Sequence, residues 1–88
     1  MEFFIAERDW FKMIIAENCR TNEYWTVVVT RCNWLFLDRR PSFNDLIGMK
    51  IKVLPDKQAI AMLEKYATNT VDGRKLRKCI DRYLELPF

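Results

Sequence analysis

Hydrophobic and polar positions follow two different periods along the chain, and together they predict a mixture of helices and strands. Residues 6–19 carry apolar side chains at helical spacing, with Trp10, Met13 and Ile14 on one face of a broad apolar arc. We therefore predict a helix over this segment. Residues 24–31 are β-branched and aromatic almost throughout, which instead predicts a strand.

A hairpin is predicted in the middle of the chain. The odd positions of the strand over 24–31 are the more apolar, so we expect them to face the core, with Tyr24 and the threonines directed outward. Asn33 supports a tight turn, after which residues 34–37 return as a second strand. The two strands are expected to pair in antiparallel fashion.

One more strand is predicted in the second half of the chain. Residues 49–54 alternate apolar side chains with Lys50 and Lys52. This alternation is typical of a half-buried strand with a solvent-facing row of lysines, at the edge of a sheet. We expect the core to contact the apolar row, formed by Met49, Ile51 and Val53.

Helices are predicted on both sides of this strand. Ser42 stands where an N-cap is expected, with Asp45 in the capping-box position, so a short helix should begin at Phe43 and stop at Gly48. A second helix follows, with Asp56 as its N-cap. The last helix has its apolar stripe at Leu76, Cys79, Ile80, Tyr83 and Leu84, and Pro87 should close it.

These elements predict one small α+β domain over residues 1–88, with a three-stranded, mainly antiparallel sheet packed against three to four helices. Half of the residues are hydrophobic and 14% are aromatic. A chain of this size has too little interior for so many rings, so we expect some of them at the surface. Surface rings favour self-association, and a homo-oligomer such as a dimer is predicted.

Several kinds of chemistry lack the residues that they need. Histidine is absent, which removes the commonest general base and metal ligand, and Ser42 is the only serine. The three cysteines, Cys19, Cys32 and Cys79, are too widely spaced for a zinc site. The two glycines are too far apart for a phosphate-binding loop. We therefore expect a binding protein and not an enzyme, with no metal, cofactor or small-molecule substrate.

The sequence also bears on the compartment. No segment has the pattern of a secretory signal, and the longest apolar runs, such as Trp34–Leu37, are far too short to cross a membrane. An odd number of widely spaced cysteines is unlike a disulfide-bonded secreted scaffold. We expect a cytoplasmic protein with reduced thiols and no membrane partner.

The excess positive charge is concentrated in the last predicted helix. The net charge of the chain is +3, and residues 74–85 contain five basic and two acidic side chains, so this segment accounts for the whole excess. At helical spacing, Arg74, Lys78 and Arg82 form a ridge opposite the apolar stripe, with Lys75 beside them.

A basic ridge of this kind can follow a phosphate backbone, so binding of RNA or single-stranded nucleic acid is the first hypothesis. The surface would be extended by four further basic residues: Lys50, Lys52, Arg39 and Arg40. Exposed rings beside it would stack on unpaired bases, and the candidates are Tyr24, Trp25 and Trp34.

The alternative hypothesis is a protein-binding inhibitor or adaptor that docks through an aromatic patch, with Trp and Tyr as anchors and Arg at the rim. No motif places the chain in a named family. In size and aromatic content it is similar to the small single-domain proteins that phages make to bind and block a host factor. That similarity implies a viral protein with a protein partner.

Overall fold

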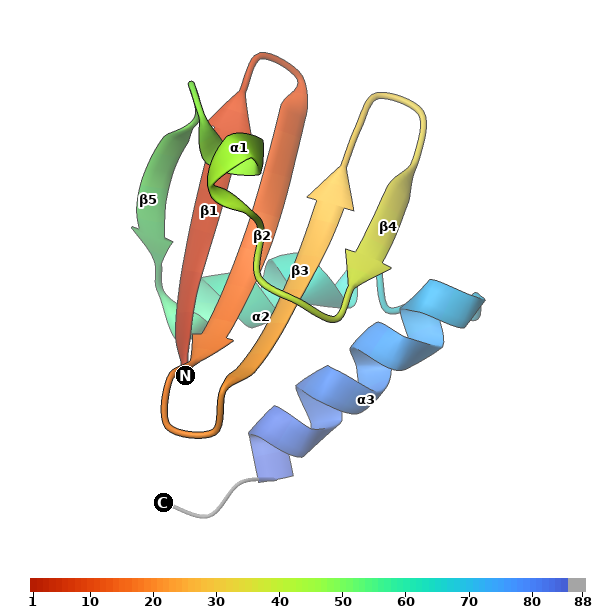
Figure 1. Cartoon of the computed structure of the whole chain (residues 1–88). Helices are drawn as coiled ribbons and strands as arrows, with labels where there is room; N and C mark the ends of the chain where they lie inside the picture. The colour runs from red at the N-terminus through yellow and green to blue at the C-terminus, as the bar shows by residue number, and fades with distance from the viewer. Residues whose placement is uncertain (86–88) are drawn as a thin grey trace.

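Five antiparallel strands form one sheet in the computed structural model, which describes residues 1–85 (Figure 1). The strand order is β4-β3-β2-β1-β5, so β4 and β5 are the two edges. In chain order the elements are β1 (Glu2–Arg8), β2 (Phe11–Asn18), β3 (Glu23–Val29), β4 (Trp34–Leu37), α1 (Phe43–Leu46), β5 (Lys50–Leu54), α2 (Asp56–Glu64) and α3 (Val71–Glu85).

The α+β class is confirmed, but the expected three-stranded sheet is wrong because the segment predicted as a helix over 6–19 is a hairpin of β1 and β2. Four successive residues of β2, Met13 to Ala16, are buried, since the sheet is covered on both faces. A strand buried on both faces loses its alternating pattern, which removes the signal that distinguishes it from a buried helix. The turn is also inconspicuous, with Asp9 at a φ of 54° in place of a glycine.

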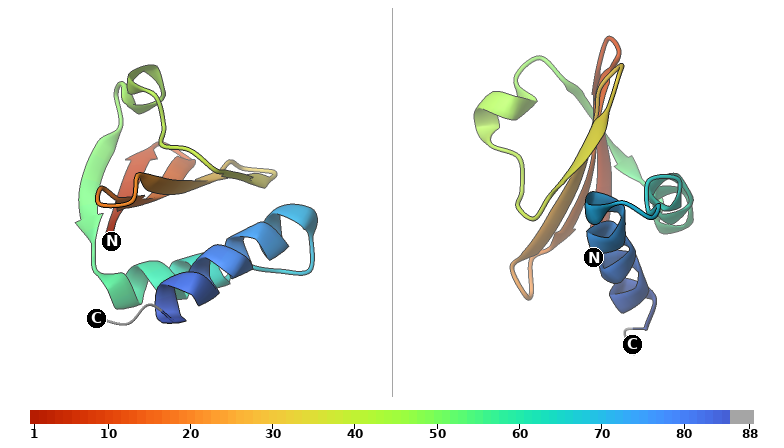
Figure 2. Two further views of the ribbon diagram at one scale, coloured as in Figure 1. Left: turned by 60° about the horizontal axis from the view of Figure 1, so that its bottom comes forward. Right: turned by 90° about the vertical axis from the view of Figure 1, so that its right-hand side faces the viewer.

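The inner face of the sheet, as we call it, packs against α2 and α3 and holds the main core (Figure 2). Phe3 and Trp25 meet edge to face there, with ring centroids 6.1 Å apart. The helices contribute Ala59 and Leu63 from α2 and Leu76 and Ile80 from α3, all fully buried. This core explains the apolar stripes of both helices.

The opposite side, the outer face, is covered only in its middle, where the segment that contains α1 crosses it (Figures 1 and 2). Leu46 and Met49 pack there against a second, smaller cluster of buried side chains: Ala6, Met13, Ile15 and Val28. The molecule therefore has three layers, with two helices on one side of the sheet and a single irregular segment on the other.

The predicted inward and outward faces of two strands, those over 24–31 and 49–54, need correction. Trp25 and Val27 are buried as expected, but Thr26 is buried as well, and its hydroxyl donates to the carbonyl oxygen of Arg39 at 2.9 Å. Of the apolar row predicted for the strand over 49–54, Met49 packs against the smaller cluster, but Ile51 is 51% and Val53 is 76% exposed. The reason is position, because β5 is an edge strand that neither the helices nor the α1 segment covers on its outer face.

Several local predictions are confirmed. The strand over 34–37 matches β4, and Ser42 and Asp45 form the expected capping box of α1. Pro55, and not Asp56, occupies the N-cap position of α2, with Asp56 in its first turn. The predicted end of the last helix at Pro87 lies outside the described residues. No helix within residues 1–85 is long and apolar enough to span a bilayer.

Candidate functional site

The basic ridge of α3 forms because the opposite side of this helix is fixed in the core. Leu76 and Ile80 are completely buried against the inner face. At the start of the helix, the amide of Gly73 donates to the hydroxyl of Thr70 at 2.9 Å, and Gly73 lies directly against Thr68. Helical geometry then turns Arg74 and the following basic residues toward solvent.

Part of the charge on α3 is neutralised by carboxylates. The guanidinium of Arg82 pairs with Glu23 at the start of β3. Arg77 lies 3.8 Å from a carboxylate oxygen of Glu64 and 3.6 Å from one of Asp81. Within residues 1–85, the cations of α3 without an ion pair are Arg74, Lys75 and Lys78. The ridge is therefore weaker electrostatically than its residue count indicates.

Lys78 and Arg82 of the predicted ridge, with Lys75 beside it, line a cleft of ≈ 510 Å³ between α3 and β4, whereas Arg74 is not among its lining residues. Its other lining residues are Phe36, Asp38 and Cys79. Burial raises the pKa of the Cys79 thiol, which keeps this group neutral near pH 7. The cleft thus offers an apolar floor with three cations and one carboxylate around it.

The structure does not place the other predicted basic residues on this surface. Lys50 and Lys52 lie on β5, at the edge of the sheet opposite β4, which α3 contacts. Arg39 and Arg40 follow β4 and interact on the outer face, where Arg40 pairs with Glu17 at 3.6 Å and lies over the ring of Tyr24. The eight predicted basic residues therefore belong to three separate regions.

The predicted aromatic patch is not formed. Trp25 is buried in the core, so it cannot stack on a base or a partner while the domain is folded, and its indole N–H has no hydrogen-bond partner within residues 1–85. Trp34 packs against Tyr66 with centroids 5.4 Å apart. The ring of Tyr24 is covered by Arg40. The three rings therefore do not share a surface.

A different apolar surface is present on the outer face. By the outer apolar surface we mean four exposed apolar side chains from elements on this side of the sheet: Phe43 and Ile47 at α1, and Ile51 and Val53 on β5. Phe43 is 82% and Ile47 is 54% exposed. Ile51 and Val53 are opposite Ala6 and Phe4 of β1, so they share the face that α1 covers. Sequence reasoning missed this surface because alternation in β5 predicted burial of the two residues that are exposed.

A hollow of ≈ 470 Å³ lies on the same face, between the sheet and the α1 segment. Its walls combine apolar side chains, with Leu35 and Leu37 from β4 among them, and polar ones, with Arg8 and Arg39 among them. Arg39 lies 3.9 Å from the carboxylate of Asp45, while Arg8 donates to the carbonyl oxygen of Ile47 at 3.3 Å. Both arginines are therefore held near α1.

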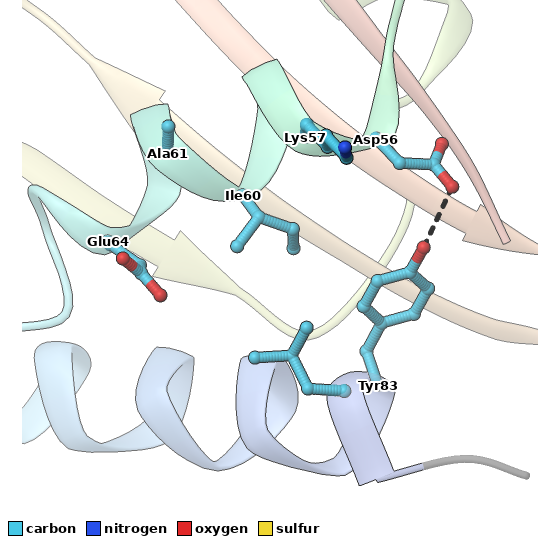
Figure 3. Close-up of a pocket in the computed structure, with 7 residues that line it drawn as sticks. Asp56, Lys57, Ile60, Ala61, Glu64 and Tyr83 are labelled. Atoms are coloured by element: carbon cyan, nitrogen blue, oxygen red, sulfur yellow. Dashed lines mark hydrogen bonds between the residues drawn. The ribbon is translucent and has the colours of Figure 1, made fainter.

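A groove of ≈ 360 Å³, separate from the cleft and the hollow, runs between α2 and α3 (Figure 3). Figure 3 shows Tyr83 reaching across it from α3, and its hydroxyl donates to the carboxylate of Asp56 at 2.8 Å. Burial and this hydrogen bond raise the pKa of Tyr83. Ile60 and Leu84 line the groove together with the polar residues Lys57 and Glu64. The hydrogen bond between Tyr83 and Asp56 joins the two helices across it.

Another exposed ring lies at the turn of the first hairpin. Trp10, at the turn between β1 and β2, is 60% exposed, with the guanidinium of Arg31 4.2 Å from its ring centre. The sequence pattern placed Trp10 on a buried helix face, and only recognition of the turn would have identified it as exposed.

Comparisons of the chain with protein-family models, with curated proteins and with solved structures find no match. The functional interpretation is accordingly built from the chain's own residues and contacts. Two surfaces carry it: the outer apolar surface with its neighbouring hollow, and the basic cleft beside α3.

Proposed function

We propose that the protein is a non-enzymatic binding protein whose partner is another protein, and that it docks through the outer apolar surface. The observation that carries the proposal is the exposure of Phe43 and Val53, at 82% and 76%. Large apolar side chains gathered on one face gain about 1.5–3 kcal/mol each when they are fully buried. A second protein is the partner whose surface is large enough to cover α1 and β5 together.

The neighbouring hollow supports a protein partner in particular. A pocket with apolar walls and arginines at its border accepts a partner's anchor side chain, and the arginines provide hydrogen bonds around it. Arg8 and Arg39 line the hollow together with Leu35 and Leu37. We therefore keep the proposal that arginines surround the docking site. The anchors that we propose are Phe43, Val53 and a side chain of the partner, in place of the Trp and Tyr residues expected from the sequence.

The test compares capture of a partner by the wild-type protein and by two double variants. Phe43→Ser with Val53→Ser removes the two most exposed side chains of the outer apolar surface without touching the core. Lys75→Glu with Lys78→Glu is the matched change at the cleft. We expect a stoichiometric protein that survives nuclease treatment to be captured by the wild type and by the cleft variant only. Capture that is unaffected by the first variant, or is lost only with the second, contradicts the proposal.

A second candidate function is the binding of RNA or single-stranded nucleic acid at the cleft beside α3. It is favoured by the position of Lys75, Lys78 and Arg82 around Phe36, since cations contact phosphates and a ring accepts a stacked base. It is weakened by the carboxylates of Glu23 and Asp38 at the same place.

The ratio of absorbance at 260 and 280 nm separates the two functions. Protein purified at low salt would carry nucleic acid if the cleft binds it, and high salt would release it, because each phosphate contact on a single strand contributes about 0.7 to the slope of log affinity against log salt. A ratio typical of pure protein at both salt concentrations counts against this candidate. Size-exclusion chromatography of the same samples tests the predicted self-association.

A further inference from the structure

We infer that the outer edge of β5 pairs with an extended segment of a protein partner in which apolar and acidic residues alternate, so that a sixth strand is added to the sheet. The inference rests on the proposed function and specifies what the partner presents to this chain. It combines three observations: an open sheet edge, the exposed apolar row of β5 and its two lysines.

The two edges of the sheet differ in how they are protected. At β4, the amide of Phe36 donates to the carboxylate of Asp72 on α3 at 3.1 Å, and α3 packs against this strand. One edge of β5 is hydrogen-bonded to β1, and within residues 1–85 no strand pairs with its opposite edge. Backbone groups at an uncovered edge are a template for another strand. The open template is therefore β5.

The side chains of β5 specify which strand fits. Ile51 and Val53 point to the outer face, while Lys50 and Lys52 point to the inner face, and all four are exposed. Residues opposite one another in neighbouring strands lie on the same face. An added strand therefore places alternate side chains beside the apolar row and the others beside the lysines. Apolar residues and carboxylates are the favourable choices at these positions.

The same lysines act against a second copy of the chain. If two β5 strands paired antiparallel about a two-fold axis, the central registers would put Lys52 opposite its own symmetry mate or opposite Lys50 of the other copy. Like charges in these positions are destabilising, and edge lysines commonly prevent self-pairing for this reason. Charge thus favours an acidic segment from a different protein.

Lys52 is the more informative of the two lysines. Glu7 of β1 lies opposite Lys50, whereas the residue of β1 opposite Lys52 is the apolar Ile5. The charge of Lys52 is therefore not balanced by its neighbour in the sheet, and a carboxylate on an added strand would be its nearest opposite charge. Reversal of this single charge should reverse the preference for the added strand.

The experiment uses two end-blocked seven-residue peptides, one alternating valine with glutamate and one alternating valine with lysine. Each is titrated into isotopically labelled full-length protein while backbone amide signals are followed by NMR. We expect the glutamate peptide to shift the signals of β5 and to slow their hydrogen exchange. Lys52→Glu should weaken binding of the glutamate peptide about tenfold and favour the lysine peptide, since the cross-strand charge pair at position 52 changes from attraction to repulsion.

Lys57→Glu, an exposed lysine on α2, is the matched control and should leave both affinities unchanged. The inference is overturned if neither peptide perturbs β5, if both bind equally, or if β5 is already protected in a dimer of the chain. A natural partner that needs Phe43 and Val53 but tolerates Lys52→Glu would uphold the proposed function and reject the added strand. Binding of the glutamate peptide with no partner that depends on Phe43 would reject the proposed function alone.

Discussion

Gly73 allows α3 to begin directly against the preceding turn. A Cβ at this position would overlap the backbone oxygen and nitrogen of Thr68. Gly→Ala inside a helix ordinarily stabilises by about 1 kcal/mol, but here we expect Gly73→Ala to destabilise the domain by about 2 kcal/mol, as overpacked sites do. Urea unfolding measures the change, with Lys75→Ala as an exposed control. A gain in stability would show that α3 does not approach Thr68 this closely.

Thr26 connects the sheet to the chain that crosses the outer face. Its buried hydroxyl donates to the carbonyl oxygen of Arg39. Thr26→Val keeps the shape and removes the donor, so we expect a loss of about 1 kcal/mol, whereas Thr26→Ser should retain part of the hydrogen bond's contribution. Thermal unfolding of both variants checks this. Equal stability of Thr26→Val and the wild type would mean that the segment is held without this hydrogen bond.

The capping box of α1 makes this element sensitive to acid. The Ser42 amide donates to the carboxylate of Asp45, and this contact, with the Ser42 hydroxyl, holds the pKa of Asp45 below its usual value of 3.8. A lowered pKa means that the cap is fully stabilising above pH 3.8 and is lost as the pH falls through the folded-state value.

We therefore expect the NMR signal of the Ser42 amide to titrate with a midpoint below pH 3.8. In Asp45→Asn the amide oxygen still accepts a hydrogen bond but no longer ionises, so the same signal should stay constant across this range. A midpoint at or above 3.8 in the wild-type protein would show that the capping box does not stabilise the carboxylate.

At the scale of elements, the sequence predicts those whose pattern is strong and local. The two long helices were identified because one face of each is apolar. The strand over 34–37 and α1 were identified because a turn residue or a cap, Ser42, marks the start of each. The first hairpin was not, because β2 is buried on both faces and its turn is formed by Asp9 and Trp10 without glycine or proline. Burial on both faces depends on tertiary structure, which a local pattern does not contain.

In the candidate site, too, features set by local spacing were predictable and features set by tertiary structure were not. The basic ridge of α3 was predictable, since helical spacing determines which side chains point together. The exposure of Val53 and Ile51 was not, because alternation identifies two faces of a strand but not which of them is covered. That choice depends on β5 pairing with β1 at the end of the sheet, far from it in sequence. The ion pair of Arg82 with Glu23 depends on tertiary structure in the same way.

Across the whole molecule, the two candidate surfaces lie on opposite sides of the sheet. The cleft belongs to α3, which packs on the inner face, while α1 crosses the outer face (Figure 2). Changes at the two surfaces should therefore be independent of each other. We expect Lys75→Glu with Lys78→Glu to change the free energy of partner binding by less than about 0.5 kcal/mol, both in the wild-type protein and in the Phe43→Ser, Val53→Ser variant. A clearly larger change would indicate one partner that spans both sides.

The most direct test of the protein-docking account is the affinity of the captured partner, measured by calorimetry at low and high salt. We expect Phe43→Ser with Val53→Ser to weaken binding about a hundredfold, because two apolar anchors that the partner would bury are lost. The wild-type affinity should fall only modestly as salt is raised. Equal affinity of the variant and the wild type, or a steep loss of affinity with salt, would contradict docking through the outer apolar surface. Either result would favour binding at the cleft beside α3.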